Sequence, residues 1–342
     1  MAKLLNLSML YYLKTSIFID MLVHTLDSNS NHKSLFQMKD LNNIKFLFNA
    51  CRDGDAVEVG ACLASLNHYH KSYHSGIYSS EDYSRPLTIA IQNGRLEVVR
   101  ELLTDFLDLG DTDRDLITAL HLACKTGNPL IVDLLVKDRR MTKEIINKVN
   151  YDNDGSALLA CKNPEVMKIL LAHEEVDIAV FTKCYFNTAL HIACTNGYLK
   201  CVDVLLKDSR MTIEILNQQN RKGKTALMIA SENHSEIVKC LLGRNEVDLA
   251  VSDTDGNTAL HITCAIGNVD TLTLLIQDGR MTSDIMNKEN WFGHTPLIEA
   301  AKEHPEMIKC LLGSNEAVLA VADKNSNSAL QILNVKMEML TV

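Results

Sequence analysis

The tetrapeptide Thr-Ala-Leu-His occurs three times, beginning at Thr118, Thr188 and Thr258, and successive copies are 70 residues apart. A fixed long period is the signature of stacked supersecondary units, and it constrains the fold more than any other feature of this chain. It also argues against catalysis, because an active site is a single constellation of residues whereas this pattern is repeated.

A second series of related motifs lies between these copies. It begins at Ser156, Thr225, Thr295 and Ser328, and an Arg-Pro-Leu segment at Arg85 extends the series upstream. Taken together, successive motifs are spaced by 32 to 38 residues. The repeating unit is therefore about 33 residues long, and every second copy carries extra residues.

Each unit has the pattern of two short helices joined by a turn. In the segment 188–206, Thr188 is a good N-cap and the apolar residues that follow it fall on one helical face. Gly197 is a stop signal, because glycine readily takes the left-handed conformation that ends a helix. A second amphipathic run then ends at Leu206. Helices this short are marginal alone, so the units must bury their apolar faces against one another.

The longer units carry an insertion after the second helix, at 140–147, 210–217 and 280–287. Each insertion begins with Arg-Met-Thr and has an acidic residue two positions after the Thr, which predicts a capped extra turn of helix. The shorter units lack a Gly between their helices, which predicts tighter turns. The array is thus a series of two-repeat modules.

These residues resemble the ankyrin-repeat family, whose units open on Thr-Pro-Leu-His-x-Ala and contain a turn with Gly. Thr295 and Pro296 even reproduce the proline of that pattern. The resemblance extends over most of the chain. It implies an all-α ankyrin-repeat solenoid of about eight helix-turn-helix units plus a terminal half unit.

The resemblance also sets the expected domain boundaries. The first unit begins near Phe46, and the last, from Ala329, ends after one helix. We expect residues 1–40 to form a non-repeat N-terminal arm or capping helix, and residues 41–342 to form the ankyrin-repeat array.

Charge and cysteine content restrict the partners and the location. The 342 residues include 34 Lys and Arg against 43 Asp and Glu, which gives a net charge of −9 and no clustered basic surface for nucleic acid. Most of the 10 cysteines lie in predicted helices, where a free Cys packs as a small apolar residue. This usage indicates a reducing compartment. We expect a monomeric array in the cytoplasm, with the nucleus as the alternative.

The N-terminal segment contains two apolar runs, at 4–13 and 17–23. Neither reaches the 18 or so residues that a membrane-spanning helix requires. We therefore do not expect membrane association, although a membrane-associated protein anchored by residues 4–23 stays open as an alternative.

Three groups of residues could carry chemistry or bind an ion. His and Cys lie three residues apart in each Thr-Ala-Leu-His motif, but equivalent residues two units away would be about 20 Å apart, too far for a shared zinc ion. We interpret each motif His as a hydrogen-bonding partner of the loop backbone. His68, His70 and His74 fall in a predicted exposed loop.

The third group is a series of arginines that recurs at the ends of the second helices: Arg140, Arg210 and Arg280. A cation there complements the helix dipole, and a stripe that binds anionic partners is the open alternative. The sequence contains none of the common phosphate-binding, zinc-protease or hydrolase motifs. We expect no catalytic, cofactor-binding or metal-binding residues, no cofactor and no enzymatic activity.

The resemblance implies that partner proteins bind at the loop tips and at the concave face of the first helices. Aromatic and Arg side chains dominate binding hot spots, and the predicted tips carry several of them. The candidates are Tyr151, Tyr185, Phe186, Arg221, Lys222, Trp291 and Phe292. The alternative is that these rings fold back onto the next unit.

The sequence therefore predicts a non-catalytic protein–protein interaction scaffold or adaptor, whose partners it does not identify. A regulatory or targeting subunit of an enzyme complex is the first alternative, and a membrane-associated ankyrin protein is the second.

Overall fold

The computed structural model describes residues 38–70, 81–103, 109–110, 112, 116–150 and 155–313. The chain divides into two compact units, with the boundary between Leu107 and Asp108. The described elements are helical and no strand occurs among them, apart from one isolated antiparallel bridge between Phe181 and Thr188. The predicted all-α fold is confirmed for these residues.

The N-terminal compact unit contains two helix pairs, α2 (Met38–Asp53) with α3 (Ala56–His70), and α4 (Glu81–Gln92) with α5 (Leu96–Leu102). Helix α2 packs against α3 and α4, and α5 packs against α3 and α4. Helix α2 begins at Met38, before the Phe46 start predicted from the repeat, and crosses the predicted boundary at residue 40. That division of the chain stays a prediction.

Two other features of the N-terminal compact unit differ from the prediction. Helix α4 begins before the Arg-Pro-Leu motif, so Pro86 lies inside the helix and not at its first position. Helix α3 runs to His70, so His68 and His70 belong to a helix and not to the predicted loop. His74 lies outside the described residues, as does the predicted terminal half unit from Ala329.

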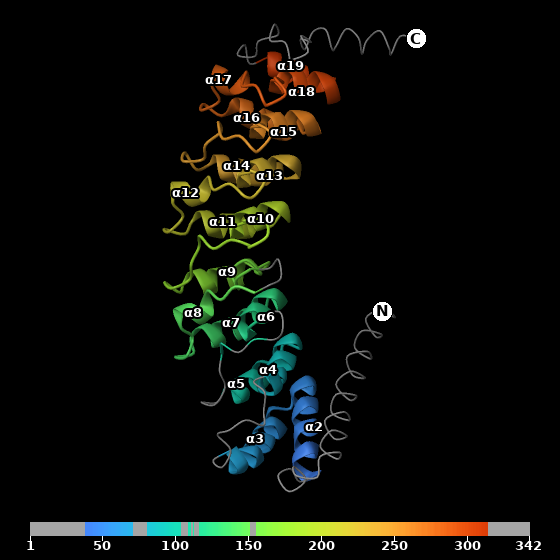
Figure 1. Ribbon diagram of the computed structural model, residues 1–342, viewed down its shortest axis with the longest axis vertical. Helices are drawn as coiled ribbons and strands as arrows, with labels where there is room; N and C mark the ends of the chain where they lie inside the picture. Colours follow the sequence, from blue (N-terminus) through green and yellow to red (C-terminus); the bar gives the residue numbers. More distant parts are fainter. Residues whose placement is uncertain are drawn as a thin grey trace, which may run out of the picture. The chain divides into compact units, whose positions relative to one another are not determined.

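The C-terminal compact unit is a stack of helix pairs in two rows (Figure 1). The first helices α10, α13, α15 and α18 pack on one another in sequence, and the second helices α7, α9, α11, α14, α16 and α19 form the other row. The bounds are α6 (Ala119–Thr126), α7 (Pro129–Val136), α9 (Pro164–Leu171), α10 (Ala189–Thr195), α11 (Leu199–Leu206), α13 (Ala226–Asn233), α14 (Ser235–Leu242), α15 (Ala259–Ile266), α16 (Val269–Gln277), α18 (Pro296–Glu303), η1 (Pro305–Met307) and α19 (Ile308–Leu312).

One predicted first helix does not form. Residues 157–160 form turns and not a helix, although Ala157, Leu158 and Cys161 are buried as the motif predicts. The cause is length, because Pro164 opens α9 two residues earlier, relative to the motif, than Ser235 opens α14. Too few residues remain for two turns of α-helix.

The insertions form short capped helices, as predicted: α8 (Lys143–Ile146), α12 (Ile213–Leu216) and α17 (Ser283–Met286). The hydroxyl of Thr142, Thr212 or Thr282 accepts a hydrogen bond from the backbone N–H three residues on. Each of these N-caps satisfies a donor that would otherwise lack a partner at the helix start.

Each motif histidine links its own helix to the loop of the next unit. In His121, His191 and His261, Nδ1 lies within hydrogen-bonding distance of the N-cap threonine, and Nε2 lies 3.0–3.1 Å from a carbonyl oxygen 33 or 34 residues on. Those carbonyls belong to Gly155, Lys224 and His294. Nε2 therefore donates to the carbonyl, and Nδ1 accepts from the threonine.

Two of the recurring arginines, Arg210 and Arg280, act between repeats. Arg210 pairs with Asp208, and its guanidinium donates to the carbonyls of Leu171, His173 and Val176, where α9 ends. Arg280 makes the equivalent bonds at the end of α14. The hydrogen bond from Arg210 lowers the pKa of Asp208. These arginines therefore complement the dipole of the preceding unit's second helix, which the sequence analysis had placed on their own helix.

The predicted difference between the two kinds of helix-to-helix turn has a packing role. The left-handed glycines Gly197 and Gly267 end α10 and α15 in the longer units. A Cβ at Gly197 would lie 2.8 Å from the ring of His234, and one at Gly267 would lie 2.5 Å from the ring of His304. These two histidines occupy the tight, glycine-free turns of the next units, so each ring packs on the bare backbone of the preceding turn.

Gly267→Ala is expected to destabilise the array by about 1–2 kcal/mol, because the φ of 82° lies in the left-handed region that L-residues avoid. Urea unfolding followed by circular dichroism measures this. The double variant Gly267→Ala/His304→Ala removes the ring but keeps the φ strain, so it separates the two costs. Equal stability of wild type and Gly267→Ala would contradict this account of the turn.

The motif histidines make stability depend on pH. Burial lowers the pKa of His191 and of His261 from about 6.5 to about 4, because the imidazolium form would be desolvated. In the window between pH 6.5 and 4, the unfolded chain therefore binds more protons than the folded chain. The contribution of His191 and His261 to folding stability is complete above pH 6.5 and is lost as the pH falls toward 4. Each histidine changes the unfolding free energy by about 1.4 kcal/mol per pH unit within that window.

The double variant His191→Gln/His261→Gln removes both titrating groups. We expect it to be less stable than wild type at pH 7.5, and to lose less stability than wild type between pH 6.5 and 5. Urea midpoints at several pH values measure both effects above the range in which carboxylates titrate. Parallel pH profiles for the two proteins would show that these rings do not set the dependence.

Candidate protein-binding surface

Four loops that precede the first helices α10, α13, α15 and α18 form the candidate surface. We call residues 182–187, 220–224, 253–257 and 290–294 the tip row. In the last three, the side-chain oxygen of the first residue accepts hydrogen bonds from the backbone N–H groups of the third and fifth. The first residue is Asn220, Asp253 or Asn290. These short Asx-type loops have a common backbone that presents their second and third side chains outward.

Neighbouring tips are joined by backbone hydrogen bonds. The N–H of Arg221 donates to the carbonyl of Tyr185 at 2.8 Å, that of Thr254 to Lys222 at 3.1 Å, and that of Trp291 to Asp255 at 3.0 Å. The tips therefore form a continuous surface whose parts hold one another in place. Two of the four tips are also bonded to the motif His of the preceding repeat, Lys224 to His191 and His294 to His261.

Glycine at the fourth tip position permits this close approach. Gly223 and Gly256 have φ values of 71° and 83°. A Cβ at Gly223 would lie 2.6 Å from the backbone nitrogen of Thr254, and one at Gly256 would lie 2.8 Å from that of Trp291. In the first tip, which is one residue longer, Phe186 adopts the positive φ of 57° instead.

The predicted aromatic residues lie on the tip row and are largely exposed. The exposed fractions are 66% for Trp291, 59% for Phe292, 51% for Tyr185 and 44% for Phe186. Arg221 and Lys222 are exposed on the tip between them. The structure thus brings these six residues onto one row, whereas Tyr151 lies outside the described residues.

Local contacts orient the exposed rings without burying them. The indole N–H of Trp291 donates to the carbonyl of Thr254 at 3.0 Å. Phe186 packs edge-to-face on Phe181, with ring centroids 5.4 Å apart, and the ring of Phe292 lies 5.9 Å from that of His294. The rings therefore make these partial contacts with their neighbours but are not folded back into burial against the next repeat.

Two parts of this surface were not predicted from the sequence. The tip at 253–257 places Thr254 and Asp255 between the basic and the aromatic tips, and Phe181 is exposed beside Phe186. The signal for the former was present, because Gly256 follows Gly223 by one repeat length. It was overlooked because that tip carries no aromatic or basic residue.

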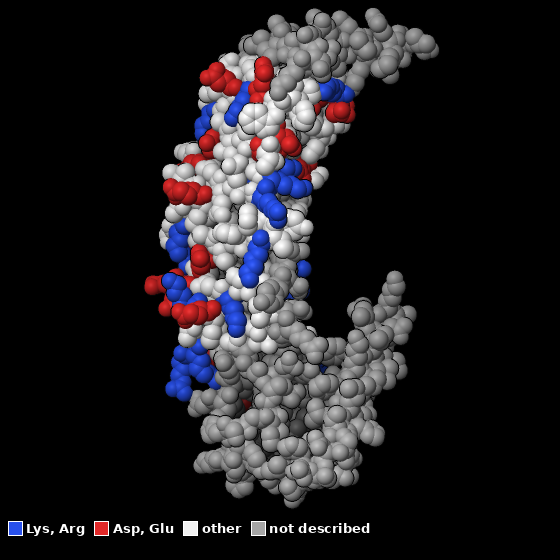
Figure 2. Space-filling view, in the orientation of Figure 1, with Lys and Arg blue, Asp and Glu red and all other residues white. Residues whose placement is uncertain are grey.

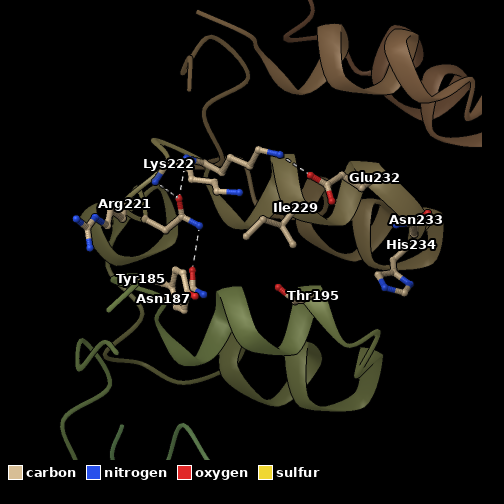
Figure 3. A pocket seen from close by; sticks show the side chains of 11 residues that line it. Tyr185, Asn187, Thr195, Arg221, Lys222, Ile229, Glu232, Asn233 and His234 are labelled. Carbon is tan, nitrogen blue, oxygen red and sulfur yellow. Dashed lines mark hydrogen bonds and ion pairs between the residues drawn. The ribbon is translucent and has the colours of Figure 1, made fainter. Parts of the chain in front are cut away.

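A groove of about 230 Å³ runs beside the tips, between α10 and α13 (Figure 3). Ile229 lies at its centre, and the ion pair between Lys224 and Glu232 crosses one wall. Tyr185, Arg221 and Lys222 line the tip end, and Thr195, Asn233 and His234 line the other end.

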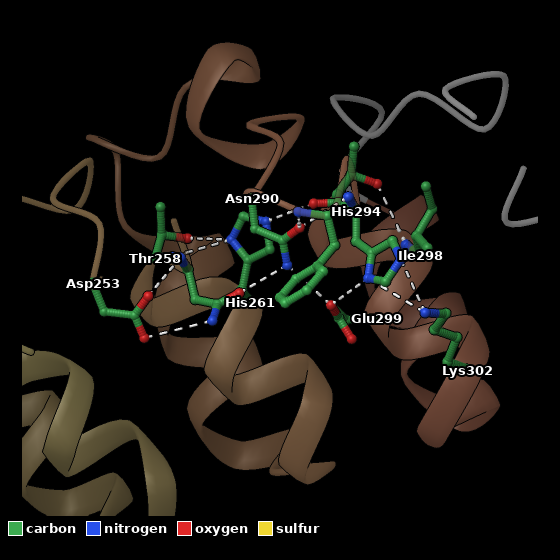
Figure 4. Close-up of polar contacts among 11 residues, drawn as sticks. Asp253, Thr258, His261, Asn290, His294, Ile298, Glu299 and Lys302 are labelled. Carbon is green, nitrogen blue, oxygen red and sulfur yellow. Dashed lines mark hydrogen bonds and ion pairs between the residues drawn. The ribbon is translucent and has the colours of Figure 1, made fainter. Parts of the chain in front are cut away.

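The matching positions two units on carry a different set of charges (Figure 4). His294, Glu299 and Lys302 occupy the places of Lys224, Ile229 and Glu232 relative to the N-cap. Nδ1 of His294 lies 2.8 Å from Glu299, and Nζ of Lys302 lies 2.9 Å from Nε2 of the same ring. Asn290 donates to Glu299 at 3.1 Å. The backbone repeats while the chemistry of the face changes.

The Cys–His pairs are poor candidates for chemistry. Burial raises the pKa of the Cys194 and Cys264 thiols, and it lowers the pKa of His191 and His261. Neither a thiolate nor an imidazolium is favoured there at neutral pH. The described residues also bring together no group of three potential metal ligands.

The wider surface carries charges of both signs. On the face seen in Figure 2, basic and acidic side chains of the described residues are interspersed, and neither sign covers it. Among the same residues, none of the helices combines the length and the apolar character that crossing a membrane requires. Residues 4–23, the anchor of the membrane-associated alternative, lie outside the described residues.

Several curated relatives match part of this chain. It is 28% identical to the protein glp-1 of Caenorhabditis elegans, over 55% of this chain and 15% of that protein. It is 27% identical to the target of rapamycin complex 2 subunit AVO2 of Saccharomyces cerevisiae, over 50% and 40% respectively. For the NF-kappa-B inhibitor cactus of Drosophila yakuba, the values are 30% identity, 53% and 34%. The matches thus span less than half the length of each relative.

The family comparison covers more of the chain. A family model for ankyrin repeats in three copies matches residues 47–147, 137–217, 157–253, 210–287 and 227–328. These matches follow the repeat period, the stacked helix pairs and the tips described above. The chain therefore belongs to the ankyrin-repeat family.

Proposed function

We propose that this protein is a non-catalytic scaffold or adaptor that binds partner proteins through the tip row and the adjoining face of the first helices. The observation that carries the proposal is the exposure of four large aromatic side chains on hydrogen-bonded tips. Exposed apolar rings are unfavourable in water unless a partner covers them, and aromatic residues with Arg dominate binding hot spots.

The rigidity of the tips supports the same proposal. A surface that is already ordered loses little conformational entropy when a partner binds. The bonds from Arg221 to Tyr185, and from Trp291 to Asp255, fix the tips before any partner arrives. Affinity would then depend on the tip side chains, and stability on the stack beneath them.

The names of two relatives support a regulatory version of this role. One is named as a subunit of a complex and another as an inhibitor. An ankyrin array that binds one protein can recruit or block it without chemistry of its own. A regulatory or targeting subunit of an enzyme complex is therefore our second candidate. We retain the cytoplasmic location, the monomeric array and the division at residue 40 as parts of the proposal.

Replacing the four exposed tip rings, in the variant Tyr185→Ala/Phe186→Ala/Trp291→Ala/Phe292→Ala, is expected to remove partners. Affinity capture from a lysate of the source cells, with quantitative mass spectrometry, compares this variant with wild type. At least one partner should fall by about tenfold or more, which corresponds to about 1.4 kcal/mol of binding free energy. Circular dichroism checks that the array remains folded.

The matched control removes four exposed apolar side chains away from the tip row. Leu130, Leu199 and Val269 lie near the starts of second helices, and Ile213 lies in an inserted helix; all four are exposed. Changing them to Ala is expected to leave the partner list unchanged. If the tip variant and the control retained the same partners as wild type, the tips would not be the binding surface.

A further inference from the structure

We propose that the groove between α10 and α13 binds an extended acidic segment of a partner protein. The inference rests on the proposed protein-binding function and specifies the chemistry of one partner segment. It begins from the charge of the groove lining, which contains Arg221, Lys222 and Lys224 but only one carboxylate, Glu232. The whole chain has a net charge of −9, so this groove reverses the sign of the molecule locally.

The single carboxylate is already neutralised within the groove. Lys224 and Glu232 form an ion pair across the wall. The side chain of Lys224 is 25% exposed and that of Glu232 is 32% exposed. Arg221 and Lys222 then supply the net charge at the tip end. Positive potential at one end of a narrow groove attracts an anionic segment and fixes its orientation.

Arg221 is held at the tip end of the groove, with its guanidinium on the outer side of the tip (Figure 3). Its backbone N–H bonds to the carbonyl of Tyr185, and Nη1 donates to the carbonyl of Cys184 at 3.2 Å. A guanidinium has five N–H donors in a fixed plane, so this anchoring leaves further donors at its outer edge. A carboxylate can accept two of them in parallel, which is the geometry that distinguishes Arg from a simple positive charge.

The remainder of the lining suits a polypeptide. Ile229 forms an apolar floor, and the ring of Tyr185 lies at the tip end of the lining. The side chains of Thr195 and Asn233 are exposed at the far end, where they can bond to the main chain of an extended segment. A partner segment with an acidic residue next to an aliphatic one matches this lining. The acidic side chain would face the cations, the aliphatic one would face Ile229, and the main chain would reach the polar far end. A nucleic acid would place phosphates along the whole groove, where Glu232 and Ile229 oppose them.

The neighbouring tip adds selectivity. Asp255 is exposed at the position that Lys222 occupies one unit before. A carboxylate that binds beside Arg221 and Lys222 would be repelled if the segment shifted one unit toward α15. Opposite charges at equivalent tip positions therefore fix the register of the partner, because binding in the wrong register is penalised.

The test measures binding of defined peptides to the full chain by fluorescence anisotropy. The probe is a fluorescein-labelled peptide of about 12 residues that alternates Glu-Leu and Gly-Ser pairs. A matched peptide has Lys in place of Glu. We expect wild type to bind the acidic peptide at least tenfold more tightly than the basic one. Affinity should weaken as salt is raised, because exposed charges are screened.

The charge-reversal variant Arg221→Glu/Lys222→Glu should lose that binding by about tenfold or more, which is about 1.4 kcal/mol. The control Lys200→Glu/Lys239→Glu makes the same change of net charge on the second helices α11 and α14, where both side chains are exposed. It should bind the acidic peptide as wild type does. Circular dichroism and urea midpoints establish that both variants are folded.

Three results would overturn the inference. They are equal binding of the two peptides by wild type, equal losses in the charge-reversal and control variants, or tighter binding of a labelled oligothymidylate than of the acidic peptide. Each leaves the proposed function standing if the aromatic tip variant still loses its partners in the capture experiment. Conversely, the aromatic tip variant could keep all its partners in the capture experiment while Arg221→Glu/Lys222→Glu loses the acidic peptide. That result would support the groove and remove the aromatic tips from the binding surface.

Discussion

The hydrogen bond between a motif histidine and the loop of the next unit is the interaction on which the rest of this structure depends. It joins His191 to Lys224 and His261 to His294, so the helix of one unit fixes the tip of the next. Burial keeps the ring neutral, which gives one nitrogen to the threonine cap and the other to the carbonyl. A ring that served only its own helix would leave the tips at 220–224 and 290–294 without this bond to the preceding repeat. Because the ring bonds to two repeats, the stacking of the helices and the geometry of these tips are coupled.

That coupling explains how a repeated framework can present a surface that does not repeat. Tips with the same backbone hydrogen bonds carry Arg221 and Lys222, then Thr254 and Asp255, then an aromatic pair. The first helices vary in the same way, with an ion pair across an apolar floor in one unit and a His–Glu–Lys network in another. Under the proposed function, substitution at these positions would change recognition and leave the stacking contacts intact, since the buried motif residues lie beneath them.

The departures from regularity follow from length and from contact between units. Two missing residues before Pro164 convert an expected helix into turns, although its apolar side chains still fill the core. Arg210 and Arg280 of the second and third insertions cross to the preceding repeat, where carbonyls at the end of a second helix need donors. In two of the tight turns, His234 and His304 each cover a glycine of the preceding turn. In all three cases the neighbouring unit decides what a local sequence does.

The sequence by itself determined the helical repeat, its period, the capped insertions and the positions of most tip residues. These follow from local rules, because N-cap threonines, left-handed glycines and apolar periodicity act within a few residues. Only the tertiary structure decided that Arg210 caps another unit's helix, that Asp255 lies between the basic and aromatic tips, and that Arg221 and Ile229 line one groove. Those relations join residues in different units, and their distances depend on how the units stack, which no pattern within a single repeat specifies.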